Sequence, residues 1–162
     1  YAADITRTVP VSGKYTAEQR ELYDSVERVM KMSRDLFRPG ETIEGINRKA
    51  RLMMADELVG IGMLRRDDAT TEKQAIQAVQ PFMKHGITHH LGLDVHDIVI
   101  PDEPLKIGMI MTCEPGLYIQ EMGIGIRIEN DILVGEPPTD LCEGIPTSAD
   151  EIEAFMSKEM YD

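Results

Sequence analysis

The first eighty residues carry two segments in which apolar positions recur at intervals of three and four. In the first segment this spacing follows a Thr16-Ala-Glu-Gln19 capping box and predicts a helix to about residue 36. Pro39-Gly40 then breaks the helix. The second helix is expected to begin at Thr42 as its N-cap and to end near residue 58. Residues 64–80 are polar and charged, and they predict a loop with a short helix.

Apolar residues in the rest of the chain follow the period of two that is typical of strands. The expected strands cover residues 2–11, 85–95, 109–119 and 124–134. A turn at residues 120–123 should join the last two, and a Ser148-Ala-Asp-Glu151 capping box predicts a C-terminal helix. Alternation along the last strand puts its isoleucines on one face and Arg127, Glu129 and Asp131 on the other. The order of elements predicts an α+β fold, with helices packed on one side of a curved antiparallel sheet.

Composition narrows the class of protein. A chain of 162 residues with 42% hydrophobic and 28% charged residues suits one globular domain with its own core. The net charge of −12 argues against a nucleic-acid partner, and no apolar run approaches the roughly 20 residues of a membrane span. Two cysteines, Cys113 and Cys142, make no disulfide framework and predict a reducing, cytoplasmic location.

All four histidines lie within twelve positions, in the run His85-Gly-Ile-Thr-His89-His90-Leu-Gly-Leu-Asp-Val-His96-Asp. Imidazole is the commonest metal ligand in proteins. A single histidine is more often structural, but four of them interleaved with glycines favour a metal site. Because side chains alternate along a strand, His90 should point away from His89 and serve a structural role.

Two carboxylates downstream strengthen the case for a metal. If the turn between the last two strands is tight, Glu114 and Glu129 become cross-strand neighbours with Cβ atoms about 4.5–5.5 Å apart. A cation between them would relieve their repulsion. Arg127 on the same face could hold a carboxylate bidentately, and Gly116 opposite it would leave room for the guanidinium. The hairpin alone leaves open a salt-bridge network of Arg127 with the two glutamates and no metal.

The histidine run resembles the signature of the aminopeptidase P and prolidase branch of the pita-bread metallopeptidases. Further segments agree with the aminopeptidase P pattern in the same order. The matching segments cover residues 1–8, 13–14, 19–20, 38–40, 85–97, 112–118, 123–131 and 151–153. The resemblance implies a pita-bread fold of which residues 1–162 form the C-terminal part, without the N-terminal domain and the first half of the fold.

The family has five metal ligands in the order Asp, Asp, His, Glu, Glu. The resemblance puts the second Asp on Asp4, the His on His89, and the two Glu on Glu114 and Glu129. The first Asp has no counterpart in this sequence. We therefore expect the chain by itself to be inactive.

The resemblance also implies a reaction. Two divalent ions, expected to be Mn²⁺ with Zn²⁺ or Co²⁺ as alternatives, would bridge a hydroxide that attacks the peptide bond before a proline. Glu114 would be both a ligand and a proton shuttle, and His96 would stabilise the oxyanion. His85 and Arg127 would line the pocket beside the metals.

Two other functions stay open beside the Xaa-Pro aminopeptidase. One is a prolidase, which cleaves dipeptides, and the other is a non-catalytic pita-bread module that binds peptides or proteins. Such modules typically lose metal ligands, whereas this chain retains four. The expected partners are peptides with proline at the second position, the N-terminal part of the same enzyme and further copies of the chain in a homo-oligomer. A nucleic acid or a membrane is not expected.

Overall fold

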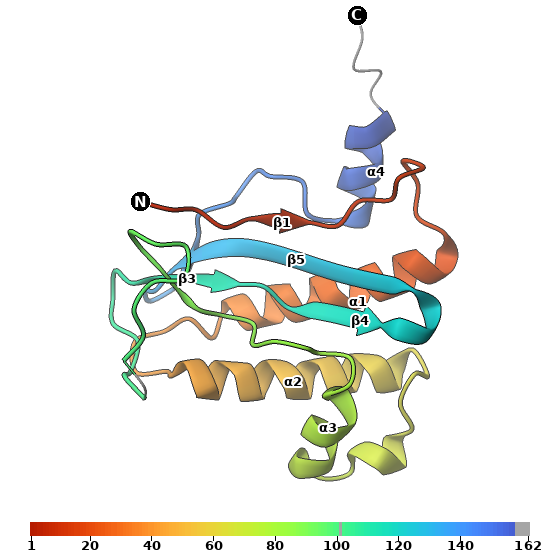
Figure 1. Ribbon diagram of the computed structural model, residues 1–162, viewed down its shortest axis with the longest axis horizontal. Coiled ribbons are helices and arrows are strands. Elements are labelled where there is room, and N and C mark those ends of the chain that lie inside the picture. The colour runs from red at the N-terminus through yellow and green to blue at the C-terminus, as the bar shows by residue number, and fades with distance from the viewer. Residues whose placement is uncertain (101, 158–162) are drawn as a thin grey trace, which may run out of the picture.

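An antiparallel sheet of six strands forms the centre of the molecule (Figure 1). The computed structural model describes residues 1–100 and 102–157. The strands are β1 (Thr6–Arg7), β2 (His90–Leu91), β3 (Ile110–Cys113), β4 (Gly116–Ile119), β5 (Ile124–Leu133) and β6 (Thr139–Asp140). Their order is β1-β5-β3-β2, and β4 and β6 also pair with β5.

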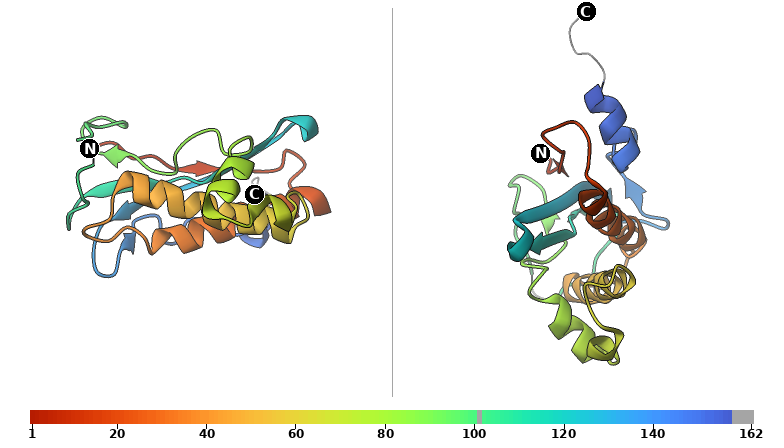
Figure 2. Two further views of the ribbon diagram at one scale, coloured as in Figure 1. Left: turned by 90° about the horizontal axis from the view of Figure 1, so that it is seen from below. Right: turned by 90° about the vertical axis from the view of Figure 1, so that its right-hand side faces the viewer.

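The helices begin where the sequence provides caps. They are α1 (Ala17–Arg34), α2 (Ile43–Gly60), α3 (Glu72–Val79) and α4 (Ala149–Ser157), with 3₁₀ turns η1 (Arg66–Ala69) and η2 (Gln120–Met122). Thr16 accepts the Gln19 N–H and Gln19 accepts the Thr16 N–H, so the predicted capping box is present. Thr42 caps α2 and Ser148 caps α4. Figure 2 shows α1 and α2 side by side on one side of the sheet.

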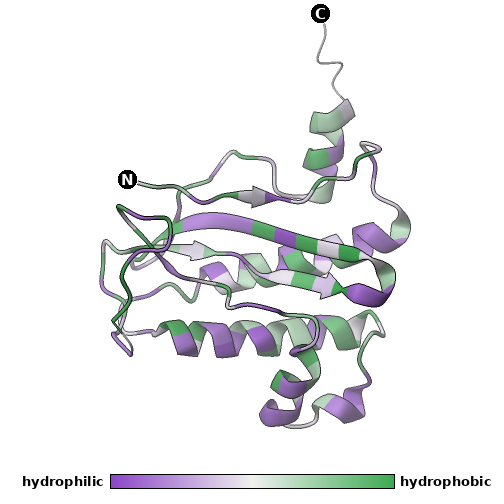
Figure 3. Ribbon diagram, in the orientation of Figure 1, coloured by the Kyte–Doolittle hydropathy of each residue, from purple (hydrophilic) through white to green (hydrophobic). Residues whose placement is uncertain are grey.

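The core lies between this helical layer and the sheet. Helix α1 packs against β5, and α2 packs against α1 and α3. Val26 of α1, Met54 of α2, and Ile128 and Ile132 of β5 are all 0% exposed. Figure 3 shows apolar and polar positions interspersed along β5, and its residues Ile126, Ile128 and Ile132 belong to the core. The predicted α+β fold is confirmed.

The register of β5 puts Glu114 and Glu129 opposite each other, as expected from the sequence. Cys113 pairs with Asn130 and Gly116 pairs with Arg127, so the same register on both sides puts Glu114 opposite Glu129. The strand predicted over residues 109–119 is interrupted at this point. Pro115 lacks an N–H for the ladder, which separates β3 from β4.

Two predicted strands are mostly wrong, because side chains take up backbone N–H groups that a strand ladder would use. Of residues 85–95, only His90–Leu91 form a strand. The N–H of Ile87 donates to Asn47 Oδ1 at 2.6 Å, and the N–H of His89 donates to Thr112 Oγ1 at 3.0 Å. The carbonyl oxygens of Ile87 and His89 still accept the backbone N–H groups of Glu114 and Thr112. The strand predicted over residues 2–11 shrinks to Thr6–Arg7, since the N–H of Asp4 donates to the Asp131 carboxylate.

The cysteines are unpaired, as the sequence suggested, and both are buried. Burial raises the pKa of the Cys113 thiol far above its ordinary value. Within the described residues, no helix combines the length and the hydrophobicity that crossing a membrane requires.

Candidate metal centre

A pocket of about 450 Å³ brings together every residue that the sequence analysis assigned to the site. It lies on the face of β5 that carries Glu129, and Glu114 comes from the junction of β3 and β4. The segment between α3 and β3 supplies the histidines, and the chain before β1 supplies Asp4. The lining residues are Asp4, His85, Gly86, Thr88, His89, His96, Glu114, Arg127 and Glu129.

His89 is prepared to offer one ring nitrogen to the pocket. Its Nδ1 lies 3.0 Å from the His90 carbonyl oxygen, which can only accept, so Nδ1 carries the proton. In the neutral ring this leaves the lone pair on Nε2. Nε2 lies 3.4 Å from Glu114 Oε1 and 3.6 Å from Asp4 Oδ2.

The carboxylates of the pocket are buried and close to one another. Glu129 is 1% exposed and Glu114 is 8% exposed. Burial raises the pKa of Glu129 above its ordinary value, and the charges of Glu114 and Asp4 raise it further. The Thr6 hydroxyl and Arg127 act in the opposite direction. Bringing these charges together therefore costs free energy in the absence of a cation.

The donor set fits a divalent metal ion. His89, Glu114 and Glu129 offer donor atoms within 4.8 Å of one another, and so do Asp4, His89 and His96. Arg127, whose guanidinium lies 3.7 Å from Glu129 and 3.9 Å from Glu114, is the cationic side chain that lines this pocket. One arginine leaves the three carboxylates incompletely compensated. His89, Glu114 and Glu129 could thus hold a cation with one nitrogen ligand and oxygen ligands, and Asp4 lines the same pocket next to His89.

His96 stands beside His89 rather than in the carboxylate cluster. The two rings are stacked, with centroids 4.0 Å apart and an angle of 15° between their planes. An imidazole binds a metal in its own plane at about 2.0–2.1 Å, so two near-parallel rings at this separation do not share one ion. His96 is exposed, which leaves its ring free to meet a molecule that enters the pocket.

His85 is held by a tyrosine that the sequence analysis left out of the site. His85 Nδ1 lies 2.6 Å from the Gly86 carbonyl oxygen and must donate to it, so in the neutral ring Nε2 accepts the Tyr118 hydroxyl at 2.6 Å. A Cβ at Gly116 would lie 2.6 Å from the Tyr118 oxygen. The space expected for the Arg127 guanidinium therefore holds the Tyr118 ring, which corrects that prediction.

The predicted bidentate contact between Arg127 and a carboxylate is absent among the described residues. Arg127 Nε and one terminal nitrogen both donate to Thr6 Oγ1, at 3.1 and 3.0 Å. Thr6 lies opposite Glu129 in the β1–β5 register and so reaches the arginine first. Thr112, also missed, donates to Glu114 Oε1 at 3.3 Å. Both threonines lie two positions from a predicted ligand, a spacing that puts side chains on the same face of an extended chain, so the sequence already contained this signal.

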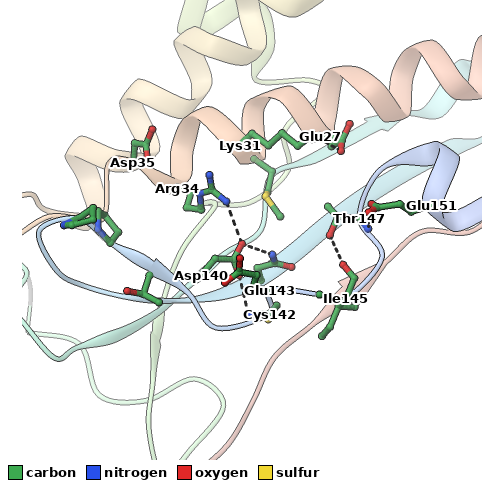
Figure 4. A pocket seen from close by; sticks show the side chains of 16 residues that line it. Glu27, Lys31, Arg34, Asp35, Asp140, Cys142, Glu143, Ile145, Thr147 and Glu151 are labelled. Carbon is green, nitrogen blue, oxygen red and sulfur yellow. Dashed lines mark hydrogen bonds and ion pairs between the residues drawn. The ribbon is translucent and has the colours of Figure 1, made fainter.

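A second cavity, of about 590 Å³, lies on the helix side of β5 between α1 and the segment before α4 (Figure 4). Four of its charged side chains form two ion pairs. Lys31 lies 2.7 Å from Glu27, and Arg34 lies 3.8 Å from Asp140. His90, predicted to be structural, lines a third cavity with Tyr1 and Met109 and does not face the metal pocket.

Comparison with known proteins agrees with this geometry. A model of metallopeptidase family M24 matches residues 1–136. The chain belongs to metallopeptidase family M24. Two M24 relatives are an Xaa-Pro aminopeptidase of Escherichia coli, 43% identical over 96% of this chain, and Xaa-Pro aminopeptidase 3 of Rattus norvegicus, 36% identical over 98%. The chain spans 38% and 33% of their lengths.

Solved M24 structures share the fold. Zinc-substituted E. coli aminopeptidase P in complex with product matches with a TM-score of 0.85 and 41% identity, over 96% of this chain and 38% of that chain. The sheet with its helices thus matches the pita-bread fold, as predicted. Other matched structures are alanine variants of the E. coli enzyme at three histidines, spaced four and seven positions apart.

Proposed function

We propose that this chain carries the metal centre of an Xaa-Pro aminopeptidase, which hydrolyses the bond between an N-terminal residue and a following proline. The observation that carries the proposal is the convergence of Asp4, His89, Glu114 and Glu129 on one pocket of an M24 chain. Relatives that are Xaa-Pro aminopeptidases support the substrate class over that of a prolidase. His85, His89 and His96 also have the spacing of the three histidines that were changed in the E. coli enzyme.

In this proposal Asp4, His89, Glu114 and Glu129 hold two divalent ions, of which Mn²⁺ suits the oxygen-rich donor set. Such ions, when bound, lower the pKa of a water molecule and make it a nucleophile at neutral pH. Four protein donors are few for two ions, so we propose that further donors come from outside these 162 residues. The 162-residue chain by itself is accordingly expected to be inactive on Xaa-Pro peptides.

Glu114 is proposed to move the proton. Its carboxylate accepts the Thr112 hydroxyl at Oε1, while Oε2 faces His85 Nδ1 and Arg127 at 3.9 Å and makes no closer contact there. Glu114 can therefore take a proton from the attacking water and deliver it to the leaving proline nitrogen. That nitrogen has no N–H in the substrate, so its ring is recognised by shape rather than by an amide donor.

His96 is proposed to stabilise the negative charge that develops on the substrate carbonyl oxygen. It stands at the exposed side of the pocket, stacked on His89, where its ring N–H can reach a bound peptide. His85 is proposed to line the substrate pocket, oriented by Tyr118. Arg127 completes the wall beside the glutamates.

Hydrolysis of small peptides by the Mn²⁺-loaded protein that contains both this chain and the expected N-terminal part tests the proposal. We expect release of the first residue from Ala-Pro-Ala, little action on Ala-Ala-Ala, and loss of activity in Glu114→Gln. Glu121→Gln, at an exposed position in the turn between β4 and β5, is the matched control and should keep activity. Cleavage of the dipeptide Ala-Pro alone would favour the prolidase, and a protein that binds no divalent metal would contradict the proposal.

A further inference from the structure

The hydroxyl of Thr6 joins two oppositely charged side chains of the pocket. Thr6 Oγ1 lies 2.5 Å from Glu129 Oε2, 3.1 Å from Arg127 Nε and 3.0 Å from a terminal nitrogen of Arg127. Glu129 and Arg127 themselves stay 3.7 Å apart, beyond hydrogen-bond distance. One neutral side chain therefore stands between a predicted metal ligand and the arginine beside it.

The direction of these hydrogen bonds follows from the donor inventory. A guanidinium has only donors, so both Arg127 nitrogens donate to Thr6 Oγ1. The hydroxyl has one proton, and a glutamate carboxylate can only accept, so that proton goes to Glu129 Oε2. The hydrogen bonds thus run from Arg127 through Thr6 to Glu129, with no direct hydrogen bond between the two charged groups, which lie 3.7 Å apart.

The backbone holds the hydroxyl in this place. Thr6 is paired with Glu129 across β1 and β5. The next residue, Arg7, fastens β1 from the other face through Nε to the Pro146 carbonyl and a terminal nitrogen to Asn130 Oδ1, both at 2.7 Å. The backbone of Thr6 is therefore held by its pairing with β5 and by the hydrogen bonds of Arg7.

We infer that Thr6 is a positioning residue of this site: its hydroxyl holds Arg127 away from Glu129 and so keeps the Glu129 carboxylate available to a cation. The inference rests on the proposed metal centre and adds to it a residue that binds neither metal nor substrate. Without the hydroxyl, the Arg127 nitrogen at 3.7 Å needs to move by less than an ångström to donate to the carboxylate directly. The resulting direct hydrogen bond from Arg127 to the Glu129 carboxylate would compete with the metal.

Mn²⁺ affinity of the intact protein, measured by titration calorimetry, tests this role. Thr6→Val keeps the shape and removes the hydroxyl, and we expect it to bind Mn²⁺ about 10–100-fold more weakly, as is usual when a partner of a metal ligand is lost. Thr6→Ser should stay within about threefold of the parent affinity, while Thr6→Ala should match Thr6→Val. The Ser and Ala variants differ from each other by one hydroxyl. Comparing their Mn²⁺ affinities therefore tests the role of the hydroxyl even if valine disturbs folding.

Two further variants separate positioning from a general loosening of β1. Thr8→Val removes a hydroxyl that, among the described residues, bonds the backbone of Arg127, and it should bind Mn²⁺ as the parent does. Adding Arg127→Gln to Thr6→Val should recover most of the lost affinity, because the competing cation is gone. Parent-like affinity of Thr6→Val, equal losses in the Ser and Ala variants, or no recovery in the double variant would overturn the inference. A parent protein that binds no Mn²⁺ would overturn the proposed metal centre itself.

Discussion

The two faces of β5 have opposite energetics, although they belong to the same ten residues. On the helix side, Ile126, Ile128 and Ile132 are at most 3% exposed and pack into the core. Burying such side chains is worth about 1.5–3 kcal/mol each. This face holds the strand in place.

On the other side of β5, Arg127, Glu129 and Asp131 face the pocket or its immediate surroundings. Burial raises the pKa of both Glu129 and Asp131, which shows that their charged forms are disfavoured there. Alternation along one strand thus separates two tasks. The apolar face stabilises the fold, and this stability offsets the free energy that the polar face needs to hold buried carboxylates.

The largest effect is expected from a cavity on the apolar face. Ile128 is fully buried, so Ile128→Ala should lower the free energy of unfolding by about 2–5 kcal/mol. Urea unfolding of the metal-free protein measures the loss. Ile124→Ala, at the partly exposed start of β5, should cost clearly less. Similar losses at both positions would contradict the division of the strand into a stabilising face and a functional face.

The next largest effect concerns turnover and not stability. If His96 stabilises the developing charge on the substrate, His96→Ala should reduce kcat by 10²–10³-fold, or about 2.7–4 kcal/mol in the barrier. Bound metal, measured on the same samples, should remain. His90→Ala is the control, because His90 lines another cavity. Wild-type turnover in His96→Ala, or loss of its metal, would show that the residue has another role.

Asn47 links the helical layer to the histidine segment. Its substitution should have a smaller effect than Ile128→Ala or His96→Ala, but a larger one than the pH dependence of Glu129. The Asn47 side chain accepts the N–H of Ile87, a residue 1% exposed. Asn47→Ala would leave that donor unpaired, so we expect a loss of about 1–3 kcal/mol in unfolding free energy together with weaker metal binding. Asn47→Asp retains an acceptor and should restore much of the loss. An alanine variant with unchanged metal affinity would show that α2 does not position the histidines.

The smallest effect is a pH dependence on the polar face. Because the pKa of Glu129 is raised in the folded, metal-free protein, folding takes up protons between the ordinary value of 4.5 and the raised value. The stabilising contribution of Glu129 is therefore fully present below pH 4.5 and is lost as pH rises through this window. Glu129→Gln has no carboxylate to titrate. As pH increases through this window, the parent should therefore become less stable relative to Glu129→Gln. A difference between the two that is constant with pH would argue against a cost of charge at this position.

Local rules in the sequence determined the helices and the central hairpin. Capping boxes at Thr16 and Ser148 predicted where α1 and α4 begin, since each cap needs only residues three positions away. The period of two along β5 and the turn before it were enough to put Glu114 opposite Glu129. The motifs likewise identified the family, because they preserve residue types and spacing and need no coordinates.

Only the tertiary structure decided the path of the histidine segment and the hydrogen bonds around the ligands. The partners of that segment come from far along the chain: Asn47 lies 40 positions from Ile87, and Thr112 lies 23 positions from His89. Thr6 meets Glu129 across 123 positions. Periodicity reports which face of a regular element is buried, but it says nothing about side chains that satisfy backbone groups in place of a ladder. Those contacts exist only once the sheet and the helices have been brought together.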